Sequence, residues 1–258
     1  MNAMLNKVPA VTLIFWLIKT LATTVGETAA DYLNTTLNLG LMATSGLMAA
    51  LLVVALGIQL WTRRYVPAVY WLVVVLISVV GTLLSDNLVD NLHVGLDVSS
   101  AIFAIALAMV FAIWYLIERT LSVHTITTTR REIFYWAAIL FTFSLGTSAG
   151  DLIGEKFGLG YAWSVVLFIA LIGFVYAAWH LLKINAVLAF WAAYILTRPL
   201  GASTGDLLSQ SSHNGGLGLG TTWTSVVFLA AIAIMVVFET RRHTRTGTQT
   251  PAELRSRT

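Results

Sequence analysis

The chain has 258 residues, of which 58% are hydrophobic and only 10% are charged, and its formal net charge is +3. A soluble domain has about 25% charged residues, so this composition excludes an ordinary soluble enzyme, a disordered chain and a nucleic-acid-binding domain. The absence of cysteine excludes disulfides, thiolate metal sites and cysteine nucleophiles.

Eight apolar stretches follow one another along the chain, and each is long enough to cross a bilayer as a helix of about 20 residues. In chain order they cover residues 8–33, 41–62, 66–90, 98–118, 132–155, 160–182, 184–208 and 219–238. The apolar runs are continuous and do not alternate with polar residues, which favours helices over strands. We therefore predict an all-α polytopic membrane protein with eight transmembrane helices.

Basic residues predict the orientation of these spans, because cytoplasmic loops are rich in lysine and arginine. The side that holds both termini has 12 of the 15 basic residues: Lys7, Arg63, Arg64, Arg119, Arg130, Arg131, Lys183, Arg241, Arg242, Arg245, Arg255 and Arg257. The sequence therefore predicts a multi-pass membrane protein with both termini in the cytoplasm. A basic, disordered cytoplasmic tail is expected over residues 241–258.

One motif occurs four times, in the first, third, fifth and seventh spans. It begins at Trp16, Trp71, Trp136 and Trp191. Ten residues later comes a glycine, at Gly26, Gly81, Gly146 and Gly201, and fifteen residues later an aspartate, at Asp31, Asp86, Asp151 and Asp206. The whole chain has only six aspartates, so four at one motif position indicate internal duplication.

The tryptophans are separated by 55, 65 and 55 residues, which indicates that a two-helix repeat was duplicated twice. We expect a first half over residues 1–122 and a second half over 123–240, each with two repeats and four spans. Because each repeat contains two spans, the four motif helices point the same way and the repeats are parallel.

The first and last copies of the motif read WLIKTLATTVGETAAD and WAAYILTRPLGASTGD. With GET in the first copy and LTRPLGAS-GD in the last, they resemble an uncharacterised bacterial family of integral membrane proteins built from four such repeats. The resemblance covers the chain apart from its tail, and it implies an inner-membrane protein of four repeats.

Carboxylates gather in the half of each motif helix that lies away from the termini. Acids four residues apart share one helix face, and like charges so placed repel, so a proton or a bound cation should neutralise them. The acids expected to bind a metal are Glu27, Asp31, Asp86, Asp90, Asp151, Glu155 and Asp206. Thr28, Thr82, Thr147 and Ser203 are expected to add hydroxyl oxygens, and such a donor set suits hard cations.

Two interpretations of the motif glycines stay open, close helix packing and a local helix break that exposes carbonyl groups. We favour packing for Gly26, Gly81 and Gly146. A break is favoured at Gly201, because Pro199 has no backbone N–H. We expect the motif tryptophans to anchor the protein at the membrane interface rather than to stack on a substrate.

Lys19 and Arg198 place positive charge inside the first and last motif helices. They either pair with motif carboxylates and hold the bundle together or act as built-in counter-ions that compete with a transported cation. The two middle motif helices have no equivalent, so we expect a two-fold-like arrangement rather than a symmetric four-fold pore.

The favoured function is a secondary transporter, a proton-coupled exporter of a hard metal cation such as Mn²⁺, Mg²⁺ or Al³⁺. Its site would lie between the repeats, and no ATP-binding motif is present. The metal is the substrate, no cofactor is expected, and the partners are the cation, protons and the lipid bilayer, without nucleic acid. A homodimer is left open.

Two other functions remain open. A transporter of an organic solute or organic cation could line its pocket with some of the 9 Trp, 8 Tyr and 12 Phe. An intramembrane enzyme could use two aspartates as an acid dyad. Four copies of one site do not fit a dyad, so we expect no enzyme.

Overall fold

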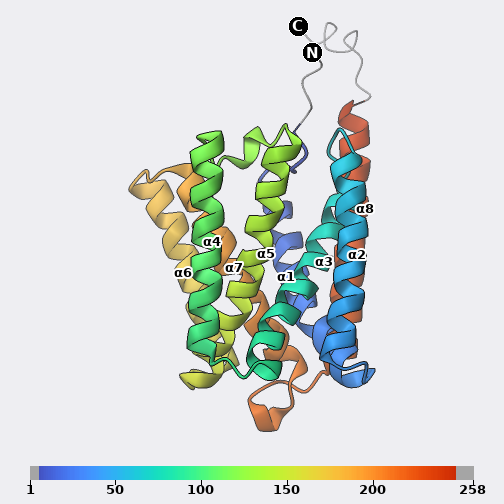
Figure 1. The fold of residues 1–258 in the computed structure, drawn as a ribbon, viewed down its shortest axis with the longest axis vertical. Helices are drawn as coiled ribbons and strands as arrows, with labels where there is room; N and C mark the ends of the chain where they lie inside the picture. The colour runs from blue at the N-terminus through green and yellow to red at the C-terminus, as the bar shows by residue number, and fades with distance from the viewer. Residues whose placement is uncertain (1–5, 248–258) are drawn as a thin grey trace, which may run out of the picture.

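The computed structural model describes residues 6–247, with side chains to residue 242, and this part of the chain forms eight α-helices without a strand (Figure 1). The helices are α1 (Leu13–Asp31), α2 (Leu41–Trp61), α3 (Pro67–Asp86), α4 (Leu96–Glu118), α5 (Thr129–Asp151), α6 (Tyr161–Leu181), α7 (Ala186–Ser209) and α8 (Thr221–Gly247). The prediction of an all-helical fold is confirmed. Because α8 continues to Gly247, the helix extends past the expected start of the tail at residue 241, and residues 248–258 of that tail lie outside the described residues.

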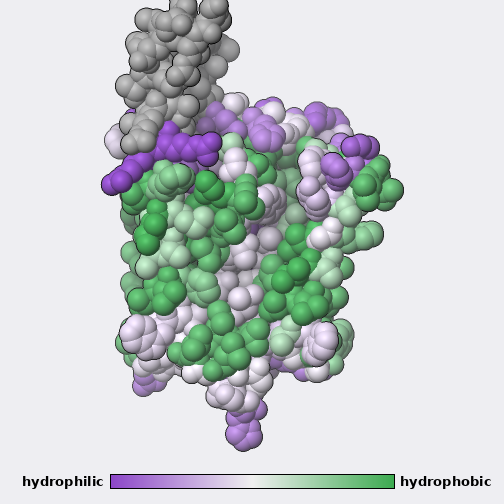
Figure 2. Space-filling view, turned by 180° about the vertical axis from the view of Figure 1, so that it is seen from behind, coloured by the Kyte–Doolittle hydropathy of each residue, from purple (hydrophilic) through white to green (hydrophobic). Residues whose placement is uncertain are grey.

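Seven of these helices are long and apolar enough to cross a membrane, which identifies a multi-pass membrane protein. The exception is α1, whose hydropathy is lowered by Lys19, Glu27 and four threonines. Hydrophobic side chains cover much of the flanks of the molecule, and hydrophilic ones gather at the end where α1 begins and α8 ends (Figure 2). We call this the terminal end.

Four helices form a closed inner ring. Helix α1 packs against α3 and α7, and α5 packs against the same two helices, so α1 and α5 are diagonal partners, as are α3 and α7. In the most apolar stretch of each helix, 50% to 72% of the residues are buried in α3, α5 and α7, against 17% to 22% in α2, α4, α6 and α8. The second group therefore forms an outer layer, visible on both sides in Figure 1.

Each outer helix packs against the motif helix of the next repeat. Thus α2 lies on α3, α4 on α5, α6 on α7, and α8 returns to α1. The four inner helices occupy equivalent places, so the expectation of a two-fold-like arrangement is wrong for the helices, although their side chains differ.

The motif glycines allow the inner helices to touch. A Cβ added to each glycine would meet the Cβ of the residue three positions before the glycine of a neighbouring motif. The distances would be 2.6 Å from Gly26 to Ser78, 2.8 Å from Gly81 to Phe143, 2.5 Å from Gly146 to Arg198 and 2.5 Å from Gly201 to Thr23. The same contact thus runs around the ring, and the packing interpretation is confirmed for all four glycines.

The predicted break at Gly201 is wrong. Helix α7 is continuous from Ala186 to Ser209 and contains Pro199 in its interior. Pro199 lies against α5, where it is near Gly146 and Gly150. Helices packed on both sides hold α7 in shape, as is common for proline in membrane helices.

An aromatic collar closes the ring near the terminal end. Every motif tryptophan follows another aromatic residue, and that residue packs on the tryptophan of a neighbouring motif. The ring centroids lie 5.7 Å apart for Phe15 and Trp71, 5.3 Å for Tyr70 and Trp136, 6.2 Å for Tyr135 and Trp191, and 5.7 Å for Phe190 and Trp16. Trp71, Trp136 and Trp191 are buried, so the expected role as interface anchors is wrong for these three, because the collar encloses them.

The segment before α1 reaches the diagonal helix α5. The Lys7 ammonium donates to Glu132 Oε2 at 2.6 Å and to the Leu60 carbonyl at 3.1 Å, while Gln59 donates to Glu132 Oε1 at 2.8 Å. Lys7 and Glu132 are each 1% exposed. This ion pair therefore fixes residues 6–12 across the terminal end of the ring.

Candidate functional site

Counting back in fours from each motif aspartate gives five levels of side chains, because residues four apart stack one turn above another. We call these twenty residues the axial column. They are Asp31, Glu27, Thr23, Lys19 and Phe15 on α1; Asp86, Thr82, Ser78, Val74 and Tyr70 on α3; Asp151, Thr147, Phe143, Ile139 and Tyr135 on α5; and Asp206, Ala202, Arg198, Tyr194 and Phe190 on α7. Contacts between diagonal helices, such as Arg198 with Thr82 and Lys19 with Phe143, show that side chains fill the ring axis.

Arg198 joins all four repeats at the second level. Its guanidinium forms an ion pair with Glu27 Oε2 at 3.1 Å and donates to Thr147 Oγ1 at 2.7 Å, to Thr82 Oγ1 and to the Thr23 carbonyl at 3.3 Å. Glu27, Thr82 and Thr147 hold the same motif position, one residue after the glycine. The arginine is 0% exposed and the Glu27 side chain 8%, so this network closes the axis.

The four motif aspartates form the first level, at the end of the ring away from the termini. We call them the aspartate ring. Asp206 is buried, and the other three are partly exposed. Glu27 acts electrostatically on all four carboxylates, and Asp31 acts on those of Asp86, Asp151 and Asp206. The structure therefore brings together five of the seven predicted acids.

The other two predicted acids, Asp90 and Glu155, lie just beyond the motif aspartates, at the end of the ring away from the termini. The first three motif helices pass directly from the aspartate into a π-helical turn, over Tyr32–Thr36, Asn87–Asn91 and Leu152–Lys156. Asp90 and Glu155 are exposed on these turns, and Glu155 accepts a hydrogen bond from Tyr161 at 3.2 Å. Each still acts on the aspartate four residues before it. Inserted π-turns are frequent at functional sites.

Of the four supporting hydroxyls, Thr82 and Thr147 lie in the axial column. Thr28 and Ser203 lie one motif position later, and one residue turns the side chain by about 100° around the helix. Thr28 accepts a hydrogen bond from Ser225 of α8 at 2.8 Å, so it serves the contact between the inner ring and the outer layer. Ser203 is buried in α7.

Lys19 lies one level nearer the terminal end than Arg198, and no carboxylate in the described part of the chain is within ion-pair distance of it. Its ammonium donates to the Tyr194 carbonyl at 2.6 Å and to Thr197 Oγ1. It also lies 4.2 Å from the ring centre of Tyr194 and 5.4 Å from that of Phe143. Of the two alternatives left open for these cations, pairing with a motif carboxylate is therefore observed for Arg198. Lys19 does not pair in this way in the described chain, because two turns of helix separate it from Glu27.

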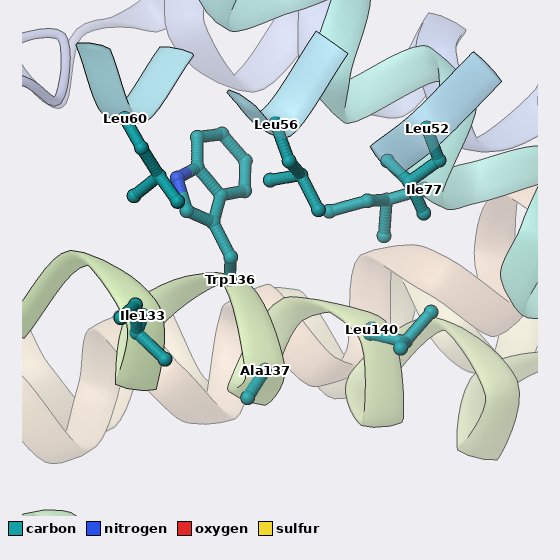
Figure 3. Close-up of a pocket in the computed structure, with 8 residues that line it drawn as sticks. All are labelled: Leu52, Leu56, Leu60, Ile77, Ile133, Trp136, Ala137 and Leu140. Carbon is teal, nitrogen blue, oxygen red and sulfur yellow. The ribbon is translucent and has the colours of Figure 1, made fainter. Parts of the chain in front are cut away.

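An apolar pocket of about 220 Å³ lies outside the axial column, between α2, α3 and α5 (Figure 3). Leu52, Leu56 and Leu60 face Ile133, Trp136, Ala137 and Leu140 across it, and Ile77 completes the lining. None of these side chains is charged, so the pocket is separate from the acids.

No group of three or more histidine, aspartate and glutamate side chains in the described part of the chain is close enough to hold a metal ion. The predicted acids therefore face one another without forming a ready-made metal site in this conformation.

The buried tyrosines and phenylalanines of the column were not predicted as site residues. Tyr70 and Tyr135 each precede a motif tryptophan, as Phe15 and Phe190 do. This aromatic pair occurs in all four copies, so the sequence already contained the pattern from which the collar could have been predicted.

Four segments of the chain, residues 14–65, 69–120, 134–185 and 189–245, match the family model described as Repeat of Unknown Function (DUF347). Each segment covers one motif helix and the outer helix that follows it. No curated protein and no solved structure shows significant similarity to the chain. The four matches confirm the predicted fourfold repeat, and the chain belongs to the DUF347 repeat family.

Proposed function

We propose that this protein is a secondary transporter that exchanges a hard metal cation, such as Mn²⁺, Mg²⁺ or Al³⁺, for protons along the axis of the inner ring. We further propose that the terminal end lies in the cytoplasm of a bacterial inner membrane and that the cation is exported. One observation supports the proposal most directly: all four repeats contribute an aspartate to one ring above Glu27, and a buried arginine neutralises Glu27.

The arginine gives the exchange a physical basis. Five carboxylates that act on one another in a low-dielectric environment need positive charge or protons. A cation that reaches Glu27 takes the place of the Arg198 guanidinium, and carboxylate and threonine oxygens suit a hard cation. When the cation leaves, Arg198 returns to Glu27, so the buried carboxylate is never left unpaired.

Proteoliposomes test this function. We expect a gradient of Mn²⁺, Mg²⁺ or Al³⁺ to drive proton flux that an internal pH dye reports. Asp31→Asn and Asp151→Asn should abolish the flux, because each keeps the side-chain size and removes a charge. Asp97→Asn is the matched control, since Asp97 is 59% exposed and forms its ion pair with Lys156 outside the ring.

Loss of flux in the Asp97 control would indicate general damage rather than a specific site. If none of the three cations moves protons in the wild-type protein, the proposal is wrong. Proton flux driven by organic cations alone would favour the organic-solute function instead.

A further inference from the structure

We infer that Lys19 is the group that carries the exchanged proton, and that the hydroxyls of Tyr194, Tyr135 and Tyr70 lead from it to the terminal end. This inference rests on the proposed exchange of a cation for protons. It assigns the proton to a place in the axial column different from the cation site at the aspartate ring.

Lys19 has the position that such a carrier needs. It is 0% exposed, and in the described chain no carboxylate lies within ion-pair distance of it. Its polar contacts are one carbonyl and one hydroxyl, which also accept hydrogen bonds from a neutral amine. An amine in such a place can lose its proton without leaving a partner charge unpaired.

Arg198 connects Lys19 to the cation site. The two positive charges act on each other through the protein core. A cation that displaces Arg198 from Glu27 removes the carboxylate that neutralised the guanidinium, so Lys19 then faces an uncompensated charge. Repulsion favours loss of the Lys19 proton at that moment, and this couples cation binding to proton release. Besides Arg198, the titratable group facing Lys19 is Tyr194, and the other neighbour, Phe143, does not titrate.

Buried hydroxyls continue from Lys19 towards the terminal end. The hydroxyl of Tyr194 interacts with the hydroxyl of Tyr135, but the geometry between them falls short of a hydrogen bond. The hydroxyls of Tyr135 and Tyr70 are 2.5 Å apart. All three tyrosines are 0% exposed, and a neutral hydroxyl can both accept and donate a proton.

Tyr65 and Glu239 stand at the end of this route. Tyr70 packs edge-on against Tyr65 with ring centroids 5.6 Å apart, and Tyr65 donates to Glu239 Oε1 at 2.7 Å. Burial, and then the Glu239 carboxylate, raise the pKa of Tyr65 well above its usual value. Tyr65 therefore stays protonated and can pass a proton to Glu239 only as it receives another.

The transfer is balanced at each step. The Lys19 ammonium gives up one proton and becomes a neutral amine, and each tyrosine oxygen accepts a proton while its own hydroxyl proton passes on. The carboxylate of Glu239 accepts the last proton and releases it to the solvent at the terminal end. After the cation has left, Lys19 regains a proton from the end of the ring that holds the motif aspartates, so one proton crosses the membrane in each cycle.

Separate measurements of net transport and of exchange test the inference. Proteoliposomes with the wild-type protein should show proton-driven cation transport and also exchange of labelled cation between two pools at equal pH. In Lys19→Met and Tyr135→Phe, we expect proton-driven transport to fall by about tenfold or more while exchange stays within about twofold. Lys183→Met and Tyr176→Phe are the matched controls, because both residues are exposed, and they should behave like the wild type.

Nuclear magnetic resonance of the lysine amines gives a readout that needs neither transport nor variants. The chain has four lysines, so the Lys19 signal can be assigned. We expect Mg²⁺ or Al³⁺ to convert Lys19 from ammonium to amine at constant pH. A Lys19 that stays charged with both cations, or a Lys19→Met protein with the proton-to-cation ratio of the wild type, would overturn the inference. A wild-type protein that moves no cation in either arm would instead refute the proposed function.

Discussion

Arg198 and Glu27 form an ion pair in the interior of the ring. Burial of an ion costs several kcal/mol, and a close partner with further hydrogen bonds offsets that cost. The threonines at the same level, Thr82 and Thr147, accept hydrogen bonds from the same guanidinium nitrogen that pairs with Glu27. The pair thus contributes to stability as a unit, and loss of one member differs from loss of both.

Arg198→Met should lower the free energy of unfolding by about 3–5 kcal/mol, because Glu27 is left as a buried charge without a partner. The double variant Glu27→Gln with Arg198→Met should recover most of that loss. Thermal unfolding of the purified protein in detergent measures both effects.

Arg130→Met is the control, since its partner Glu118 also binds Arg131 and the Arg130 side chain is 67% exposed. It should change the free energy of unfolding by less than about 1 kcal/mol. Equal stability of the wild type and Arg198→Met would show that the axial ion pair does not hold the ring together.

At the scale of the helix, the motif glycines determine how closely the inner helices approach. Without a side chain at these positions, the backbone of one helix lies against the residue three positions before the glycine of the next motif. Close approach through small residues is a main source of helix association in membranes. The same substitution should therefore have opposite effects in the inner ring and in the outer layer.

Gly26→Ala should destabilise the protein by about 1–3 kcal/mol, because the new Cβ would lie 2.8 Å from the backbone carbon of Ser78, which a rotamer change cannot move. Gly57→Ala on α2 is the matched control, since no atom lies within 4 Å of a Cβ there. It should be neutral or stabilising by up to about 1 kcal/mol. Unfolding temperatures of the two variants compare them directly, and a stabilised Gly26→Ala would contradict the packing of α1 on α3.

The number and type of helices could be predicted from the sequence because they depend on local runs of apolar residues. The aspartate ring could also be predicted, because identical residues at one motif position must occupy equivalent places in parallel repeats. The partners of Arg198 could not be predicted, because they depend on the order of helices around the ring. That order places Thr82 on the helix diagonally opposite Arg198, and the order cannot be deduced from the sequence of either helix alone.

Two local rules led to wrong expectations at Pro199 and at Asp90. A proline inside a helix removes one hydrogen bond, yet packing on α5 keeps α7 continuous. A spacing of four placed Asp90 on the face of Asp86 with both acids inside the helix, but the chain turns into a π-helical segment at Asn87 and Asp90 becomes exposed. Sequence spacing assumes regular helix geometry, and it is unreliable where that geometry changes.

For the whole molecule, the orientation in the membrane is a prediction that reporter fusions can check. Fusions at the terminal end, after Arg64, Arg130, Lys183 and Arg242, should report the cytoplasm because basic residues stay on that side. Fusions at the opposite end, near Asn38, His93, Gly158 and Gly216, should report the outside. Reversal of any two fusions would contradict four parallel repeats, whereas reversal of all of them would reverse the proposed direction of transport.

The return of α8 to α1 has a consequence for synthesis of the protein. The ribosome makes α1 first, but its covering helix begins only at Thr221. Until then α1 lacks both α8 and the hydrogen bond from Ser225 to Thr28. A nascent chain can therefore insert its helices one after another. The packing around α1, however, is complete only after α8, the last helix, has left the ribosome.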